Sequence, residues 1–270
     1  MSDIERVVVP LDLSSENEPA IDTAARLAAR AEARLHGVFI EDEDLWRLAC
    51  LPFARQVSTS TGAEPFTPDH IEPQWRAASE RARQDIADAA ARHGVAWSFE
   101  VMRGSTAAAF ASAAKRDLVV AGALTRPVAG HFRVEARWWT SLDAASGTVL
   151  MARRPWAASG SVVIMLHDRS KRAVRLLEAA ALIAEARTGA LTVVCEPGLA
   201  GSEGFEAWLA ERLAAYSLRL DIEIAAGGGE EMQRHLGHFD CGLVAVEAGN
   251  AVDRLRVRFE HLGCDLLIVR

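Results

Sequence analysis

The segment VVVPL at Val7–Leu11 gives the first indication of the fold, because a closely similar segment, VVIML at Val162–Leu166, follows it 155 residues later. Both are apolar runs rich in β-branched residues, as is typical of strands buried on both faces of a sheet. A second pair has the same offset: His36–Glu41 returns as Leu191–Glu196. An internal repeat of this kind predicts two copies of one folding unit.

Two further pairs extend the repeat with smaller offsets. Leu118–Ala121 returns as Leu243–Val246 after 125 residues, and the closing runs Val149–Arg153 and Leu266–Arg270 are 117 residues apart. The first half therefore contains about 30 additional residues, and the second half is shortened before its last strand. We expect one domain over residues 1–156, with an insertion at about 42–73, and a second, reduced domain over residues 157–270.

Each half alternates strand-like and helix-like segments. Pro19 suits the first turn of a helix over about 20–33, and its counterpart covers about 171–187. A longer helix is expected from Trp75 to His93, ending at Gly94. This alternation predicts an α/β fold made of two tandem, doubly wound parallel sheets of five strands.

Composition excludes several classes of function. The 30 Lys and Arg against 37 Asp and Glu give a net charge of −7, shared nearly equally between the halves, which argues against a nucleic-acid partner. No segment has the run of about 18 apolar residues that a membrane-spanning helix needs. Four scattered cysteines form no disulfide framework, and the acidic start leads directly into a strand. We expect a cytoplasmic protein with no membrane partner.

Two motifs give the chain a family resemblance. The first strand ends in VPLDLS at Val9–Ser14, and DLVVAG stands at Asp117–Gly122. The chain resembles the tandem, two-domain members of the universal stress protein family over nearly all of both halves except the insertion. The resemblance implies strand order 3-2-1-4-5 in each half. It also implies that the fifth strands, Val149–Ala152 and Leu266–Val269, pair antiparallel and join the halves as a pseudo-dimer. A homodimer of whole chains is also open.

The resemblance implies a stress-response role and directs attention to a nucleotide motif. Family members that bind nucleotide have Gly, two residues, Gly, nine residues, Gly, then Ser or Thr, with an aspartate after the first strand. Asp12 and Gly122 match, but Thr125, Glu135 and Ala136 replace the rest. Glycines let backbone N–H groups approach phosphate, whereas a carboxylate repels it. We expect a non-catalytic protein without a cofactor, in which ATP binding is lost or weakened. The alternative is an adenine-nucleotide module, with ATP held by Asp12, Gly122 and Thr125.

The second half departs further from the motif. His167 stands where the first half has Asp12, and Glu247 stands where it has Gly122. No phosphate cradle is expected there, so this half is interpreted as a structural partner. A hydrolase on the same scaffold is a third possibility, without support from a G-x-S-x-G motif.

Three other features have open interpretations. His235, His238, His261 and Cys264 include the ligand types that zinc prefers, and they precede neighbouring strands, but packing is the favoured explanation for them. The pair Trp138–Trp139 either packs in the core or an interface, or lies at the pocket that the family uses. The insertion is either a solvated loop or a lid or interface arm.

Overall fold

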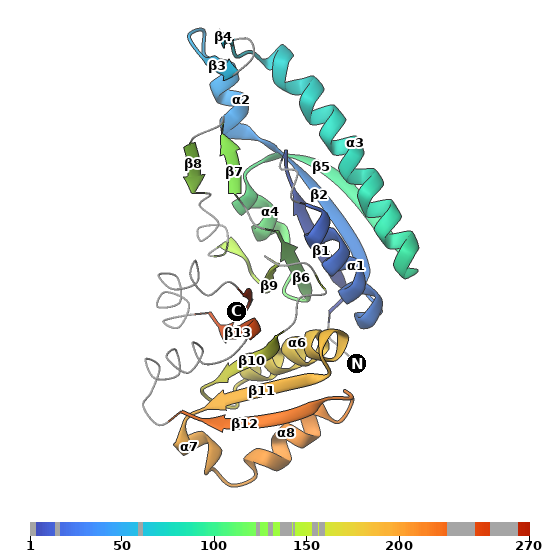
Figure 1. Ribbon diagram of the computed structural model, residues 1–270, viewed down its shortest axis with the longest axis vertical. Coiled ribbons are helices and arrows are strands. Elements are labelled where there is room, and N and C mark those ends of the chain that lie inside the picture. Colours follow the sequence, from blue (N-terminus) through green and yellow to red (C-terminus); the bar gives the residue numbers. More distant parts are fainter. Residues whose placement is uncertain are drawn as a thin grey trace.

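A ten-stranded sheet runs through both halves of the described structure (Figure 1). The computed structural model describes residues 4–13, 17–58, 62–122, 125–128, 132–135, 142, 144–152, 156, 160–225, 241–248 and 264–270. The strands of the large sheet are β1 (Arg6–Leu11), β2 (Arg34–Asp42), β5 (Trp97–Gly104), β6 (Asp117–Ala121), β9 (Thr148–Met151), β10 (Ser161–Leu166), β11 (Ala190–Cys195), β12 (Arg219–Ile224), β13 (Cys241–Glu247) and β14 (Asp265–Val269).

Helices and two small hairpins complete the described structure. The helices are α1 (Glu18–Ala31), α2 (Glu43–Ala49), α3 (Pro68–His93), α4 (Thr106–Ser112), α6 (Lys171–Arg187), α7 (Pro197–Ala200) and α8 (Phe205–Leu213). One hairpin joins β3 (Arg55–Ser58) to β4 (Gly62–Pro65), and the other joins β7 (Thr125–Val128) to β8 (Phe132–Glu135). None of the described helices is both long enough and apolar enough to cross a lipid bilayer.

The strand order repeats in the two halves of the sheet. The order is β12-β11-β10-β13-β14-β9-β6-β1-β2-β5. When the five strands of each half are numbered in chain order, both halves read 3-2-1-4-5 from the outer edge of the sheet to its centre. Neighbouring strands within each half are parallel. The two halves meet where β9 and β14 pair antiparallel, with Met151 opposite Leu266. The predicted α/β fold and the predicted pairing of the fifth strands are confirmed.

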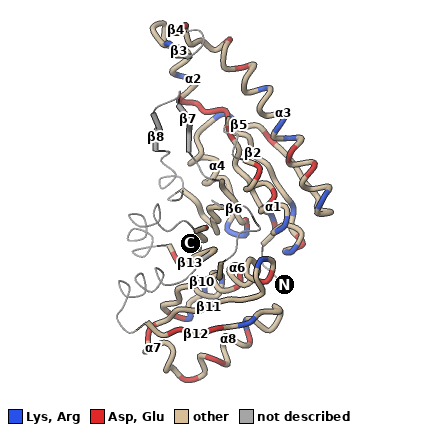
Figure 2. The backbone as a smooth tube through the Cα atoms, viewed as in Figure 1, with Lys and Arg blue, Asp and Glu red and all other residues tan. Residues whose placement is uncertain are grey.

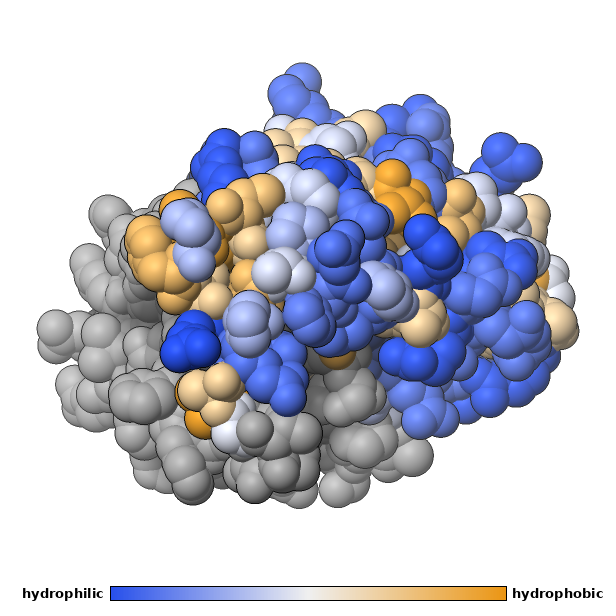
Figure 3. Space-filling view, turned by 90° about the horizontal axis from the view of Figure 1, so that it is seen from above, coloured by the Kyte–Doolittle hydropathy of each residue, from blue (hydrophilic) through white to orange (hydrophobic). Residues whose placement is uncertain are grey.

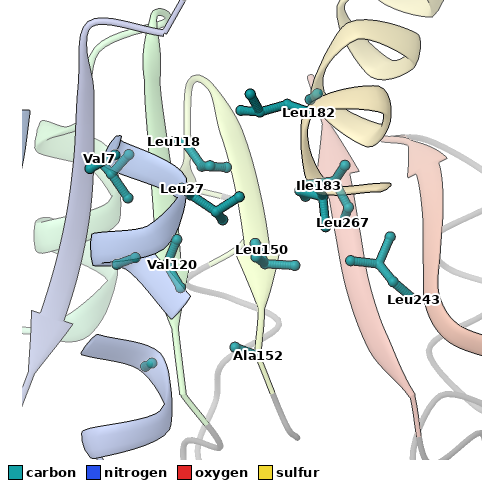
Figure 4. Packing of buried hydrophobic residues seen from close by; sticks show 14 of the residues in the cluster. Val7, Leu27, Leu118, Val120, Leu150, Ala152, Leu182, Ile183, Leu243 and Leu267 are labelled. Atoms are coloured by element: carbon teal, nitrogen blue, oxygen red, sulfur yellow. The ribbon is translucent and has the colours of Figure 1, made fainter. Parts of the chain in front are cut away.

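Both faces of the sheet are covered, as the apolar strands require. Alternate residues of β1 point to opposite faces: Val7, Val9 and Leu11 belong to one buried cluster and Val8 to the other. The first cluster includes residues of α1, α3, α6 and α8, and the second includes α4. In Figure 4, Leu150 of β9 and Leu267 of β14 lie between helices of both halves, so the core continues across the junction.

The insertion forms regular secondary structure over most of its described length. It contains α2, the β3–β4 hairpin and the first turns of α3, which begins at Pro68 instead of near Trp75 and continues through Pro73. Ile71 and Trp75 are buried on one side of α3, so packing of these side chains outweighs the hydrogen bond that Pro73 cannot make.

The far end of the insertion exposes apolar side chains. Leu48, Leu51, Phe53 and Val57 are exposed, Phe53 by 76%. Figure 3, which looks onto this end of the molecule, shows apolar residues interrupting a largely hydrophilic surface. The insertion is thus anchored on one side by buried residues and presents apolar residues on the other.

Candidate functional site

The ends of two adjacent strands bring the predicted first-half site together. Asp12 directly follows β1 and Gly122 directly follows β6, and these strands are neighbours in the sheet. The carboxyl ends of parallel strands at a change of strand order form the usual ligand crevice of such sheets. Both residues are half-buried. The structure therefore places two of the three predicted site residues at one crevice.

Asn17 shapes the loop that follows β1. It is the residue before α1, but its side chain makes no capping hydrogen bond to that helix. Instead its Nδ2 donates to the backbone carbonyl of Asp12, at 3.3 Å. This bond holds the start of α1 against the end of β1. Residues 14–16, between them, lie outside the described part of the chain.

The third predicted residue, Thr125, lies in a hairpin that the sequence analysis did not predict. Thr125 begins β7 and is the register partner of Glu135, the last residue of β8. These two residues occupy the second and third glycine positions of the nucleotide motif. The signal was present in the sequence, since TRPV and FRVE flank a short segment containing glycine, a pattern typical of a hairpin. Ala136 and Trp138–Trp139 lie outside the described residues.

The acidic run at the end of β2 has a structural role. The Asp42 carboxylate accepts hydrogen bonds from the backbone N–H groups of Asp44 and Leu45, at 2.9 and 3.2 Å, and so caps α2. The neighbouring Glu41 accepts from Arg103 of β5. Figure 2 shows this run as a red stretch at the junction of β2 with α2.

The second-half crevice carries acidic groups. The Asp168 carboxylate accepts a hydrogen bond from the backbone N–H of Ser170 at 2.8 Å, and its bonds to the hydroxyl and backbone of Ser170 lower its pKa. Burial raises the pKa of Glu247, and the Asp168 carboxylate raises it further. Within the described chain, Glu247 Oε1 is buried and has no hydrogen-bond partner. Two carboxylates at this strand end oppose an anionic ligand.

The possible zinc site falls mostly outside the described residues. His235, His238 and His261 are among the residues that are not described, and Cys264 is buried directly before β14. The described residues contain no cluster of His, Cys, Asp and Glu that could hold a metal ion. The zinc interpretation therefore stays a hypothesis.

Among the comparisons with known proteins, similarity was found to solved structures and not to family models or curated sequences. No protein-family model and no curated protein sequence matches the chain. A universal stress protein from Archaeoglobus fulgidus superposes with a TM-score of 0.64 at 12% sequence identity, covering 100% of this chain and 97% of its own.

Two shorter proteins match about half of the chain. They are universal stress protein UspA from Lactobacillus plantarum (20% identity, 55% of this chain and 97% of its own, TM-score 0.41) and a universal stress protein family member from Burkholderia pseudomallei (23%, 57% and 99%, TM-score 0.38). The full-length likeness shows that this chain has the fold of a universal stress protein, as its sequence resemblance implied.

Proposed function

We propose that this chain is a universal stress protein-like, non-catalytic stress-response protein whose first-half nucleotide site is lost or weakened. The fold and the motifs around Asp12 and Gly122 support the family assignment, and the stress-response role follows from that resemblance. The proposal includes two domains, residues 1–156 and 157–270, associated as an intramolecular pseudo-dimer. The repeated strand order and the β9–β14 ladder support this arrangement.

The main support for weakened nucleotide binding is the hairpin in which Thr125 pairs with Glu135. A phosphate cradle needs several backbone N–H groups that point freely toward the ligand. In an antiparallel ladder, alternate residues direct their N–H groups to the opposite strand instead. Glu135 also replaces the third glycine of the motif, and a carboxylate near a phosphate would repel it by about 1–4 kcal/mol at a few ångströms.

Adenine-nucleotide binding in the first half is the second candidate. It is favoured by one observation, the adjacency of Asp12 and Gly122 at the ends of neighbouring strands. In this alternative Asp12, Gly122 and Thr125 would hold ATP without the full glycine motif. The second half offers no such pair, because His167 and Glu247 occupy the corresponding positions.

Calorimetric titration with ATP and Mg²⁺ distinguishes the two candidates. We expect the wild-type protein to bind weakly or not at all. We expect the triple variant Thr125→Gly, Glu135→Gly, Ala136→Ser, which restores the motif, to bind measurably more tightly. Tight binding by the wild type that disappears in Asp12→Ala, but persists in the second-half control Asp168→Ala, would establish the alternative and contradict the proposal.

A further inference from the structure

A cavity lies between the two halves, away from both strand-end crevices. Its volume is about 500 Å³, within the range of small-molecule sites. Ile4 and Glu5 precede β1, Arg30–Glu32 end α1, and Ala215 and Tyr216 follow α8, so the cavity lies where the amino ends of strands from both halves converge. In Figure 1 this is the region where α1 approaches α6, beside the chain's N-terminus.

The floor of the cavity is apolar. Leu182 of α6 is 1% exposed and belongs to the main hydrophobic core. Ile4, Ala31 and the Tyr216 ring are partly buried and pack against the same core. A ligand in this cavity would therefore place an apolar body against side chains from both halves.

The rim of the cavity is charged, and Arg30, the one cation among the described residues that line it, is already paired. Arg30 forms an ion pair with Glu185, whose other carboxylate oxygen accepts from the backbone N–H of Ser217 at 2.9 Å. Glu5 forms an ion pair with Arg116. Among the described residues, the Glu32 carboxylate has no ion pair or side-chain hydrogen bond. The rim thus carries one negative charge that no described cation neutralises.

Tyr216 lines the cavity and has two carboxylates nearby, Glu178 and Glu185. Burial raises the pKa of its phenol, and the Glu178 and Glu185 carboxylates raise it further, against an opposing effect of Arg30. Its ring also offers a face to which an organic cation is attracted. An anionic ligand would meet Glu5 and Glu32 at the rim and gain no unpaired cation in return.

We infer that this cavity is a binding site for a small organic cation, an ammonium group attached to a compact apolar body. The ammonium group lies at the Glu32 carboxylate, and the apolar body rests on Leu182 and the Tyr216 ring. Contacts with both halves make the ligand stabilise their association. The site is independent of the nucleotide site, because it is lined by residues at the opposite ends of the strands.

Three probes of nearly equal shape test the inference: phenethylamine, phenethyl alcohol and phenylpropionate, which are cationic, neutral and anionic. Each is titrated into the full-length protein while the methyl resonances of Ile4 and Leu182 are followed by NMR. We expect saturable shifts with the amine and much weaker binding of the other two. Equal binding of the alcohol or of the carboxylate, or no saturable shift with the amine, overturns the inference.

Two variants locate the binding. Glu32→Gln removes the free charge, and we expect it to weaken amine binding about three- to fivefold, the effect of a partly solvated charge pair. The matched control Glu72→Gln makes the same change at an exposed position of α3 and should leave binding unchanged. Ala215→Phe fills the cavity and should abolish binding. Unaltered binding in both Glu32→Gln and Ala215→Phe contradicts the assignment, and thermal unfolding confirms that each variant is folded.

Discussion

The guanidinium carbon of Arg103 lies 4.3 Å from the centroid of the Trp46 ring, and Arg103 Nε and Nη2 both donate to Glu41 Oε2, at 3.0 and 2.9 Å. Arg103 also lies 5.5 Å from the ring of Trp75, which stacks with Trp46. One cationic side chain on β5 therefore contacts β2, α2 and α3 together. This arrangement fixes the inserted helix α2 to the edge of the large sheet.

Replacing Arg103 tests that role. Arg103→Ala removes two charge-assisted hydrogen bonds and two cation–π contacts from a partly exposed site, so we expect a loss of about 1–2 kcal/mol in the free energy of unfolding. Amide hydrogen exchange should become faster in α2 than in β10 or β11. Arg76→Ala, at an exposed position of α3, is the control and should change neither quantity. Uniform acceleration of exchange across the sheet would contradict a local role.

The buried ion pair between Arg187 and Asp265 gives a second prediction. Their side chains are 3% and 0% exposed, Nη2 and Oδ2 are 2.6 Å apart, and the pair joins the end of α6 to the start of β14. Asp265→Asn leaves a buried guanidinium without its counter-ion, so we expect it to destabilise the protein by about 3–5 kcal/mol in urea unfolding. Glu80→Gln breaks an ion pair with Arg83 on the exposed surface of α3 and should have no measurable effect. Similar midpoints for both variants would show that the buried pair is not needed.

Glu247 should make stability depend on pH in an unusual direction. Burial, followed by the Asp168 carboxylate, raises its pKa in the folded protein above the ordinary value of 4.5. Its contribution to stability is therefore fully present below pH 4.5 and is lost as the pH rises through the folded pKa. Glu247→Gln cannot titrate, so we expect the variant to lack the pH-dependent contribution of Glu247 to the free energy of unfolding. Urea unfolding of the wild type and the variant over a range of pH measures that contribution as the difference between them.

Asp168 supplies a comparison of opposite sign. The hydroxyl and backbone of Ser170 lower its pKa below the ordinary 3.8, so its contribution is present above that pH and is lost as the pH falls. The wild-type-minus-variant difference for Asp168→Asn should therefore grow with increasing pH, whereas that for Glu247→Gln should decline. Parallel pH profiles for the two variants would contradict the assigned pKa directions.

Glu32 ends α1 in the left-handed conformation, with φ of 54°, which a residue with a Cβ adopts at a cost. Gly94 takes the equivalent conformation after α3, with φ of 67°, and a Cβ added there would meet no other atom within 4 Å. We expect Glu32→Gly to stabilise the protein by about 1 kcal/mol and Gly94→Ala to destabilise it by a similar amount. Guanidinium unfolding checks both, and destabilisation by Glu32→Gly would show that its side chain contributes more than the strain removes.

The sequence predicted the parts of the fold that depend on local pattern. The apolar runs at Val7–Leu11 and Val162–Leu166 became β1 and β10, because such segments bury both faces of a strand. The start of α3 was predicted too late, because burial of Ile71 and Trp75 outweighs the usual effect of Pro73. The helix propensity of the local sequence does not include the free energy of burying these side chains against the rest of the protein.

Some of the candidate site residues could also be predicted from the sequence, and others could not. Asp12 and Gly122 could be placed because strand ends in a parallel sheet have defined neighbours. The pairing of Thr125 with Glu135 does not follow from the glycine motif, because that motif describes a phosphate-binding loop and not a hairpin. The cavity beside Glu32 could not be predicted, because it depends on how α1 and α6 pack across the junction.

The antiparallel ladder between β9 and β14 has a consequence for synthesis of the chain. Met151 and Leu266 are register partners, yet more than a hundred residues separate them. A nascent chain that has formed the first-half part of the large sheet, which ends at β9, presents β9 as an unpaired edge until β14 leaves the ribosome. Because unpaired apolar edges recruit other strands, we expect misassembly with other chains to occur mainly in this interval.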